Sequence, residues 1–448
     1  MLVMLRRLSL TPVLALIAMA LLVVPSGGTT DATAAGGVVP GQFIVLVNEG
    51  FDPAGVANDH AAAPLRVFGP ATHGFAARLS ESQVDRLSVD PRVNNVVADR
   101  SVSITCHKAN HPCSGGGGGG GSTQVVPAGV KRIGADQVWT DTTGSAIGVA
   151  VIDTGVDFNH SDLSVAPDCF TAYASCQDDN GHGTHTAGTI AALNNSQDVV
   201  GVAPGVTLYS VKVLDTSGSG TWSAVIAGVD WVTARAGTIH VANMSLGGSG
   251  PDSGNCGDPN SDGIIDDPFH RAICNSVAAG VTYVVSAGND PNKEVSQQVP
   301  AAYPEVIAVA SSTALDGSNA CRSFSGKILA DTASYFTTDG AGVSVSAPGA
   351  DKEDISKSCF IKSVGILSLK VGGGTTRMSG TSMASPHVSG VAALILEDHP
   401  GFSPADIRSR IESSADRKGT APLNSPSVAY TFDGEREGVV SAPGATQP

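Results

Sequence analysis

The stretch Ile147-Gly148-Val149-Ala150-Val151-Ile152-Asp153 gives the clearest indication of the fold. Its apolar residues are mostly β-branched, and such a run without polar alternation is typical of a parallel strand buried on both faces. Asp153 stands at the carboxyl end of this run, where open α/β sheets place their functional groups. The stretch therefore predicts a doubly wound sheet with a polar site at one edge.

The sequence around this stretch agrees with that fold. From Gln124 onward, β-branched runs alternate with segments of small residues, as at 208–213, 223–234, 282–286, 306–310 and 343–347. This alternation is the pattern of a mostly parallel sheet with helices on both faces. We therefore predict an α/β domain over residues 124–430.

A second informative stretch is Gly380-Thr381-Ser382-Met383-Ala384-Ser385-Pro386-His387, followed by the apolar run 388–396. A turn of small residues here leads into a helix and leaves Ser382 in the first turn, where free backbone N–H groups favour negative charge. That placement suits a nucleophilic serine. Gly, Ser and Thr also form ordinary turns and caps, so the stretch alone does not decide.

A third stretch, Asn180-Gly181-His182-Gly183-Thr184-His185, places His182 at the start of another helix. A lone aspartate is most often a cap, and a lone histidine a satisfied polar contact. Asp153, His182 and Ser382 together, each among Gly and Thr residues, favour a catalytic triad instead. His185 and His387 are expected to be structural.

These three segments resemble the Asp, His and Ser motifs of the subtilisin-like serine proteases, in the same chain order. The resemblance runs from about Gln124 to Tyr430. It implies a serine endopeptidase that cleaves protein or peptide substrates through an acyl-enzyme intermediate. His182 would act as general base, Asp153 would orient its ring, and Asn289 with the Ser382 N–H would stabilise the oxyanion.

The same resemblance supplies the substrate-binding residues, which flank an extended peptide or line the pocket for the residue before the cut. They are Gly218, Ser219, Gly220, Trp222, Ser245, Leu246, Gly247, Ala287 and Gly288. Trp222 is either the wall of an outer subsite or an ordinary core residue. Because no acidic residue is evident in the pocket, we expect a broad or apolar preference.

A calcium site is also implied by the resemblance, since the segment 193–199 is similar to the calcium loop of the family. The expected ligands are Gln124, Asp162, Leu193, Asn195, Gln197 and Val199. Such oxygen ligands suit Ca²⁺. A second candidate is the acidic segment 258–267, which has glycine at the sixth position of an EF-hand-type loop but Phe269 at the twelfth. This segment either binds a second calcium ion or is an acidic insertion that binds no metal. No organic cofactor is expected.

The region ahead of the protease-like domain predicts a small α+β unit. Strands are expected at 41–47, 74–79 and within 93–104, with a helix capped by Ser80. This unit, residues 35–104, resembles the ferredoxin-like inhibitory propeptide of the family, which implies an intramolecular inhibitor and folding aid. Residues 105–123 form a glycine-rich linker and processing region, and residues 431–448 a disordered tail.

Residues 1–34 are predicted to be a signal peptide, because Arg6 and Arg7 precede a short apolar run. The protein is therefore expected to be secreted, with no membrane association after signal removal. Its eight cysteines then favour disulfides. The preferred hypothesis pairs cysteines that are neighbours in the sequence: Cys106–Cys113, Cys169–Cys176, Cys256–Cys274 and Cys321–Cys359.

Other classes of protein are disfavoured. The net charge of −15 argues against nucleic acid as a partner. The absence of an HExxH motif disfavours a metalloprotease. Esterases of the α/β-hydrolase type run Ser, Asp, His, an order that differs from this chain. A non-cleaving, peptide-binding scaffold is the remaining alternative, and casein hydrolysis distinguishes it from a protease.

Overall fold

The structure is a computed structural model that describes residues 37–69, 71–105, 116–117, 123–428 and 433–447. The expected signal peptide, the Cys106–Cys113 pair and most of the glycine-rich linker lie outside the described residues. Along the described residues, no helix combines the length and apolar character that a membrane crossing requires.

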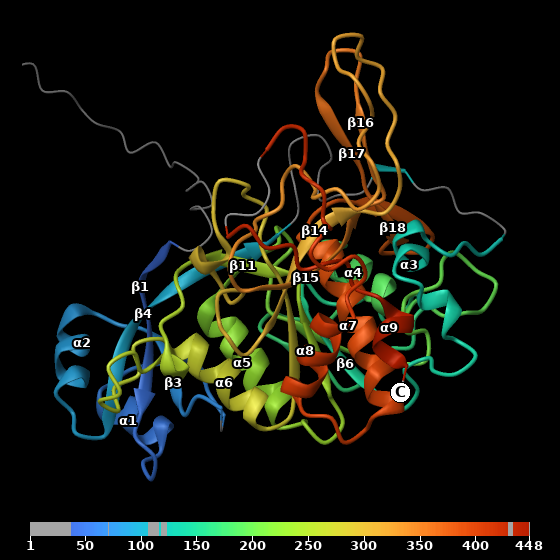
Figure 1. The fold of residues 1–448 in the computed structure, drawn as a ribbon. Coiled ribbons are helices and arrows are strands. Elements are labelled where there is room, and N and C mark those ends of the chain that lie inside the picture. Colours follow the sequence, from blue (N-terminus) through green and yellow to red (C-terminus); the bar gives the residue numbers. More distant parts are fainter. Residues whose placement is uncertain (1–36, 70, 106–115, 118–122, 429–432, 448) are drawn as a thin grey trace, which may run out of the picture. The chain divides into compact units, whose positions relative to one another are not determined.

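The larger domain is built on a seven-stranded, fully parallel sheet with strand order β15-β14-β12-β10-β6-β8-β7. Its strands are β6 Gly148–Asp153, β7 Phe170–Thr171, β8 Thr207–Lys212, β10 Val241–Met244, β12 Thr282–Ser286, β14 Ile307–Thr313 and β15 Val343–Ala350. Strands β6, β14 and β15 of this sheet are labelled in Figure 1. The predicted doubly wound α/β fold is confirmed.

Helices cover both faces of this sheet. They are α3 Ala128–Arg132, α4 His182–Ala191, α5 Trp222–Thr233, α6 Pro268–Ala278, α7 Thr381–Asp398, α8 Pro404–Ser413 and α9 Ala442–Thr446. On β6, Ala150 and Ile152 face the core formed with α5 and α6, whereas Val149 and Val151 face the core formed with α4 and α7. Burial on both faces explains the unbroken apolar run in the sequence.

The N-terminal unit is an antiparallel sheet with two helices. Its elements are β1 Val38–Val47, α1 Pro53–Asp59, β2 Pro64–Val67, β3 Gly74–Arg78, α2 Glu81–Ser88 and β4 Val93–Ile104. The predicted capping box of Ser80 and Gln83 is present at the start of α2. The last residues of β4 leave this unit and pair with β9 Ser219–Thr221 and β11 Leu246–Ser249.

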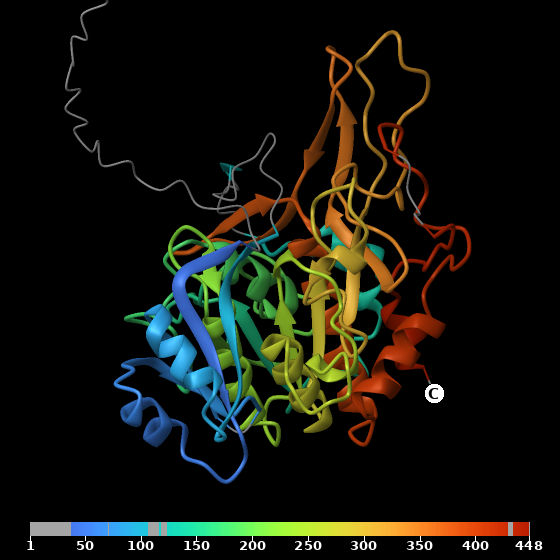
Figure 2. The same ribbon diagram turned by 90° about the vertical axis from the view of Figure 1, so that its left-hand side faces the viewer.

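Further strands and short helices lie outside these two units. They are β5 Gly116–Gly117, β13 Gln298–Val299, β16 Lys352–Ile355, β17 Ile361–Val364, β18 Ile366–Leu369, β19 Thr375–Met378, and the 3₁₀ turns Ala135–Gln137, Asn255–Gly257 and Val295–Gln297. The β16–β17 hairpin projects from the parallel sheet domain in both views (Figures 1 and 2).

The expectation of a disordered tail over 431–448 is wrong for residues 433–447. Val439 forms β-bridges with Ser346 and Asp416, and α9 follows it. Val439, Val440 and Ala442 are fully buried. Val440 and Ala442 belong to the core cluster that includes residues of α7, a tertiary contact that the small, polar composition of the tail did not indicate.

Three of the four disulfides in that hypothesis are present, namely Cys169–Cys176, Cys256–Cys274 and Cys321–Cys359. They join residues 7, 18 and 38 positions apart, respectively.

Candidate active site

The candidate active site lies where the carboxyl ends of the parallel strands meet the starts of two helices. Asp153 ends β6, His182 begins α4, and Ser382 stands in the first turn of α7. All three residues are fully buried. Residues far apart in the chain are thus brought to one edge of the sheet, as the sequence predicted for such folds.

Asp153 and His182 are in direct contact. His182 Nδ1 lies 2.8 Å from Asp153 Oδ1 and 2.9 Å from Oδ2. The backbone N–H of Thr154 donates to Asp153 Oδ1 at 2.6 Å and fixes the carboxylate. A carboxylate at Nδ1 keeps the proton on that nitrogen and leaves Nε2 to act as the base. The further contact expected between Nε2 and the Ser382 hydroxyl stays a prediction.

Asp178 supports this histidine and was not recognised in the sequence. It is buried, and its carboxylate accepts hydrogen bonds from Thr154 Oγ1 at 2.9 Å, from Gly181 N at 2.9 Å and from Thr184 N at 2.8 Å. These bonds cap the start of α4 and tie it to the loop after β6. An acidic residue a few positions before a helix is the signal that could have identified it.

Ser382 lies in a network of hydroxyl groups. Its Oγ donates to the Ser245 carbonyl at 3.0 Å and lies 2.7 Å from Thr105 Oγ1. Ser245 Oγ donates to the Ser382 carbonyl at 2.8 Å and lies 2.9 Å from Ser385 Oγ. These buried contacts hold the first turn of α7 against the end of β10.

Asn289 and Ser382 converge on one carbonyl oxygen. Asn289 Nδ2 donates to the Thr105 carbonyl, and the Ser382 N–H donates to the same oxygen at 3.4 Å. Asn289 Oδ1 accepts from Thr381 N at 2.9 Å, which fixes the orientation of the amide. Two donors aimed at one carbonyl form the geometry that stabilises a developing oxyanion.

The last residues of β4 occupy the groove that the sequence predicted to bind the substrate. Val102 pairs with Gly220 and Ser103 with Ser219 on one side, and Ile104 pairs with Leu246 on the other. The chain therefore runs between two strands as an added third strand, the usual geometry of extended peptide recognition. Its residue Thr105 then reaches Ser382.

The remaining substrate-binding residues surround this strand. Gly218 has a φ of +76°, and a Cβ built there would lie 2.8 Å from Ile104 Cδ1, so this position favours glycine. Trp222 is 5% exposed and shares a core cluster with Val102. It can therefore be a core residue and the wall of an outer subsite at the same time. Ser245, Leu246 and Gly247 follow β10, and Ala287 and Gly288 follow β12.

His185 and His387 are fully buried, and burial lowers their pKa to about 3 and about 4. His185 Nε2 lies 3.0 Å from the Ile366 carbonyl, and His387 Nδ1 lies 2.8 Å from the Met383 carbonyl. Neutral rings bound to backbone carbonyls fit the structural role expected of both.

The candidate calcium loop gathers its oxygens around one point. Gln124 Nε2 lies 2.6 Å from the Leu193 carbonyl, 2.8 Å from the Gln197 carbonyl, 3.1 Å from the Val199 carbonyl and 3.4 Å from Asn195 Oδ1. Four acceptors that face one small volume are typical of a cation site. Half a turn of the Gln124 amide would exchange its nitrogen for its oxygen and add a further ligand.

Asp162 completes this cluster. Its Oδ2 accepts a 3.4 Å bond from Val199 N, whereas its buried Oδ1 has no hydrogen-bond partner among the described residues. Burial raises the pKa of Asp162 to about 7. A buried carboxylate oxygen without a partner is costly unless a cation neutralises it, so these residues fit Ca²⁺.

The second candidate loop uses its acidic groups differently. Asp258 accepts from Asp262 N at 3.1 Å and Gly263 N at 2.9 Å, so its carboxylate closes a turn. The loop instead contacts the N-terminal unit: Asn94 Nδ2 donates to the Gly263 carbonyl at 2.7 Å, and Ile265 N donates to Asn94 Oδ1 at 2.9 Å. These contacts favour the interpretation of an insertion over that of a metal loop.

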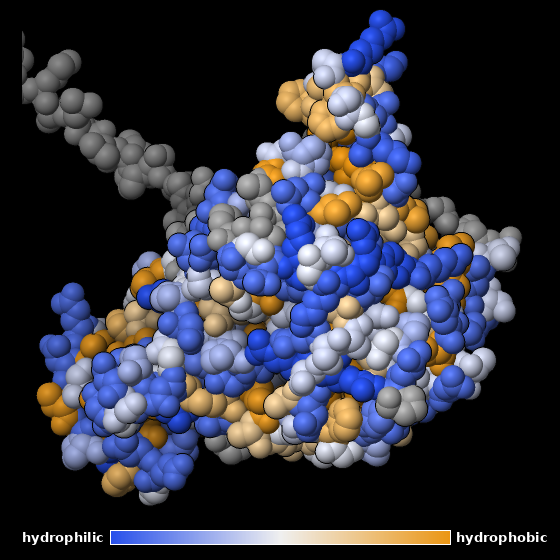
Figure 3. All heavy atoms as spheres, in the orientation of Figure 1, coloured by the Kyte–Doolittle hydropathy of each residue, from blue (hydrophilic) through white to orange (hydrophobic). Residues whose placement is uncertain are grey.

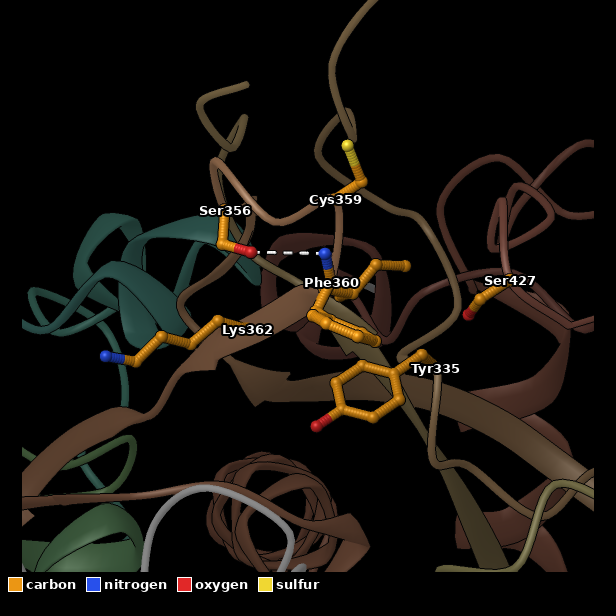
Figure 4. Close-up of a pocket in the computed structure, with 7 residues that line it drawn as sticks. Tyr335, Ser356, Cys359, Phe360, Lys362 and Ser427 are labelled. Carbon is orange, nitrogen blue, oxygen red and sulfur yellow. Dashed lines mark hydrogen bonds between the residues drawn. The ribbon is translucent and has the colours of Figure 1, made fainter. Parts of the chain in front are cut away.

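A separate groove lies on the projecting hairpin, and none of its lining residues is a candidate catalytic or calcium-binding residue. Figure 4 shows its lining by Tyr335, Ser356, Cys359, Phe360, Lys362 and Ser427. Phe360 is 73% exposed, and Figure 3 shows apolar surface beneath the hydrophilic tip of this arm. The groove contains neither the serine nor the histidine of the candidate site.

Comparison with protein families agrees with this geometry. The description of the subtilase family matches residues 144–429, and that of peptidase inhibitor I9 matches residues 48–105. The fold and the site define a serine endopeptidase with a propeptide ahead of it. The chain belongs to the subtilase family.

Curated relatives support the same assignment. Subtilisin E of Bacillus subtilis is 37% identical over 355 residues, which cover 77% of this chain and 76% of the relative. Subtilisin DY of Bacillus licheniformis is 38% identical over 301 residues, covering 66% and 93%. M-protease of Shouchella clausii is 34% identical over 352 residues, covering 78% and 76%.

Proposed function

We propose that this protein is a secreted, calcium-stabilised serine endopeptidase that matures by cutting its own chain between Thr105 and Cys106. The observation that carries the proposal is the position of the Thr105 carbonyl, which accepts hydrogen bonds from both Asn289 and Ser382. The match to peptidase inhibitor I9 ends at residue 105, which agrees with a propeptide that finishes there.

The reaction follows from the named groups. His182 takes the proton of the Ser382 hydroxyl while Oγ attacks the Thr105 carbonyl carbon, and Asp153 stabilises the imidazolium that forms. Asn289 and the Ser382 N–H hold the resulting oxyanion. The imidazolium then gives its proton to the amine of Cys106, the Thr105–Cys106 bond breaks, and an acyl-enzyme remains. Water, activated by His182, releases the Thr105 carboxylate and restores Ser382.

The first prediction concerns the site of processing. Purified, processed protein should yield a mature chain that begins at Cys106 and a propeptide fragment that ends at Thr105. Intact-mass measurement of both fragments checks this, because each boundary fixes one mass. The freed Thr105 carboxylate should remain in the groove as a product, since β4 keeps its pairing with β9 and β11. A first cut elsewhere between residues 105 and 123 would contradict the assignment of Thr105.

The second prediction concerns calcium. Gln124, Asp162 and Asn195 with the carbonyls of the 193–199 loop would hold the ion. Because a ligand that binds only the native state stabilises it by about 2.7 kcal/mol at a hundredfold excess over Kd, excess chelator should lower Tm by several degrees or more. Calorimetry with and without calcium measures the shift.

Two variants sharpen the calcium test. Asp162→Asn should abolish most of the calcium-dependent shift, because it removes the charged ligand. Asp262→Asn, in the second candidate loop, should leave the shift unchanged. A Tm that chelator does not alter in the wild type would count against the loop assignment.

The third prediction concerns pH and the propeptide. Asp230 on α5 accepts bonds of 2.9 Å from Gly69 N and Ala71 N of the propeptide. Burial raises its pKa to about 6 in this arrangement, whereas an exposed aspartate titrates near 3.9. The contribution of Asp230 to propeptide binding is therefore fully present below pH 4 and is lost as pH rises through 6.

A pH jump measures this effect. Processed complex moved from pH 4.5 to pH 7.5 should release its propeptide faster and gain activity sooner, with affinity lower by about 25-fold. Asp230→Asn should flatten this dependence, because asparagine keeps an acceptor but does not titrate. A pH profile that is identical in the variant would refute a role for this carboxyl group.

Secretion is part of the same proposal and rests on the signal-like residues 1–34 together with the disulfides of the structure. Disulfides persist in oxidising compartments. Detection of the mature chain in culture medium, with its N-terminus sequenced, tests it.

A further inference from the structure

Ser286 ends strand β12 and reaches the side chain of the residue that precedes the proposed cut. Its side chain is buried, with 2% of the residue exposed. Ser286 Oγ lies 2.6 Å from Thr105 Oγ1. Among the described residues, the other contact of this hydroxyl is a donation of 3.4 Å to the Met244 carbonyl, which is long for an O–H donor. The short bond to Thr105 is therefore the main one.

The two branches of Thr105 face different surroundings. The hydroxyl lies between Ser286 Oγ and Ser382 Oγ, at 2.6 and 2.7 Å. The methyl group faces Gly247, where an added Cβ would lie 3.7 Å from Thr105 Cγ2, an ordinary contact distance. The pocket thus separates a polar side from a small apolar side and fits a β-hydroxy residue in one orientation.

We propose that Ser286 makes this protease selective for a hydroxyl-bearing residue, threonine above all, immediately before the cleaved bond. This inference rests on the proposed function, since it concerns the same groove. Valine has the shape of threonine but would leave the Ser286 hydroxyl with only its long contact to Met244. A buried hydroxyl that loses its partner costs free energy, and sites built around such a bond reject the analogue that lacks it. The selectivity differs from the broad or apolar preference expected from the sequence.

Matched peptides test the selectivity. Two p-nitroanilide substrates carry Val-Ser-Ile, the order of residues 102–104, followed by either threonine or valine. For the wild-type mature enzyme, kcat/KM should favour the threonine peptide about tenfold, as one hydrogen bond implies. In Ser286→Ala the ratio should fall to about one, mainly because the valine peptide improves. Ser312→Ala, a buried serine on the neighbouring strand β14, should keep the wild-type ratio.

The possible outcomes distinguish the selectivity of the enzyme from its protease activity. Equal rates on both peptides in the wild type, or an unchanged ratio in Ser286→Ala, would overturn the selectivity while leaving the protease intact. Hydrolysis of neither peptide by protein that has been processed and freed of propeptide would contradict the proposed function as well.

A second measurement does not depend on the folding of Ser286→Ala. In the full chain, Thr105→Val should slow self-cleavage about tenfold, because the precursor then lacks the hydroxyl that Ser286 contacts. Thr105→Ser keeps that hydroxyl and should mature at close to the wild-type rate. Equal maturation rates for valine and serine at position 105 would overturn the proposal.

Discussion

Ser382→Ala is expected to give a full-length precursor that never matures. The substitution removes the hydroxyl that we propose attacks the Thr105 carbonyl, while Asn289 and the backbone N–H of residue 382 still hold that carbonyl. In subtilisin itself, loss of the nucleophile lowers kcat by about 10⁶. Electrophoresis of the expressed chain and casein hydrolysis at high enzyme concentration measure the effect.

The control for this variant is Ser413→Ala, an exposed serine of α8, which should mature and cleave casein normally. Far-UV circular dichroism should be the same for both variants, because the bonds from Ser245 Oγ to the Ser382 carbonyl and to Ser385 Oγ do not involve the Ser382 hydroxyl. Normal maturation of Ser382→Ala, with no other protease present, would refute self-cleavage by this serine.

Asp153→Asn is expected to lower kcat by about 10⁴, the size of the effect in the corresponding variant of another serine protease. The Thr154 N–H donates to Oδ1, so the asparagine oxygen should take that position and the amide NH₂ should face His182 Nδ1. Nδ1 would then have to accept, and the ring proton would move to Nε2. A protonated Nε2 cannot take the proton of Ser382.

Because the tautomer is the cause, the loss should shrink as pH rises and the serine proton is removed by hydroxide. The control is Asp168→Asn, which removes a surface carboxylate that pairs with Arg235 at 2.8 Å. That variant should keep kcat within a factor of two. A similar small change in Asp153→Asn would contradict the role given to the Asp153–His182 contact.

The parallel sheet could be predicted because burial on both faces leaves a direct record in the sequence. The run 147–153 has no polar residue before Asp153, and β6 is buried at every position. The capping box at Ser80 is equally local, since both partners lie within four residues. Features that depend on neighbouring residues alone were therefore predicted with nearly correct bounds.

Several contacts between residues far apart in the chain were not predicted. The position of Asp178 ahead of α4 suggests a helix cap, but its bond to Thr154 Oγ1 is evident only in the structure. Val439 lies in a polar tail, and its burial depends on Ser346, almost a hundred residues earlier. Ser286 was not predicted to contact the substrate, because its hydrogen bond to Thr105 Oγ1 depends on side-chain positions that the sequence does not give.

The central claim is that Ser382 is the nucleophile of a site assembled with His182 and Asp153. Its most direct test is labelling of the mature enzyme with a fluorophosphonate, followed by tandem mass spectrometry of the digested protein. We predict one adduct per chain, located on Ser382, with labelling strongly slowed in Asp153→Asn. An adduct on a different serine, or no adduct in enzyme that hydrolyses casein, would contradict the account.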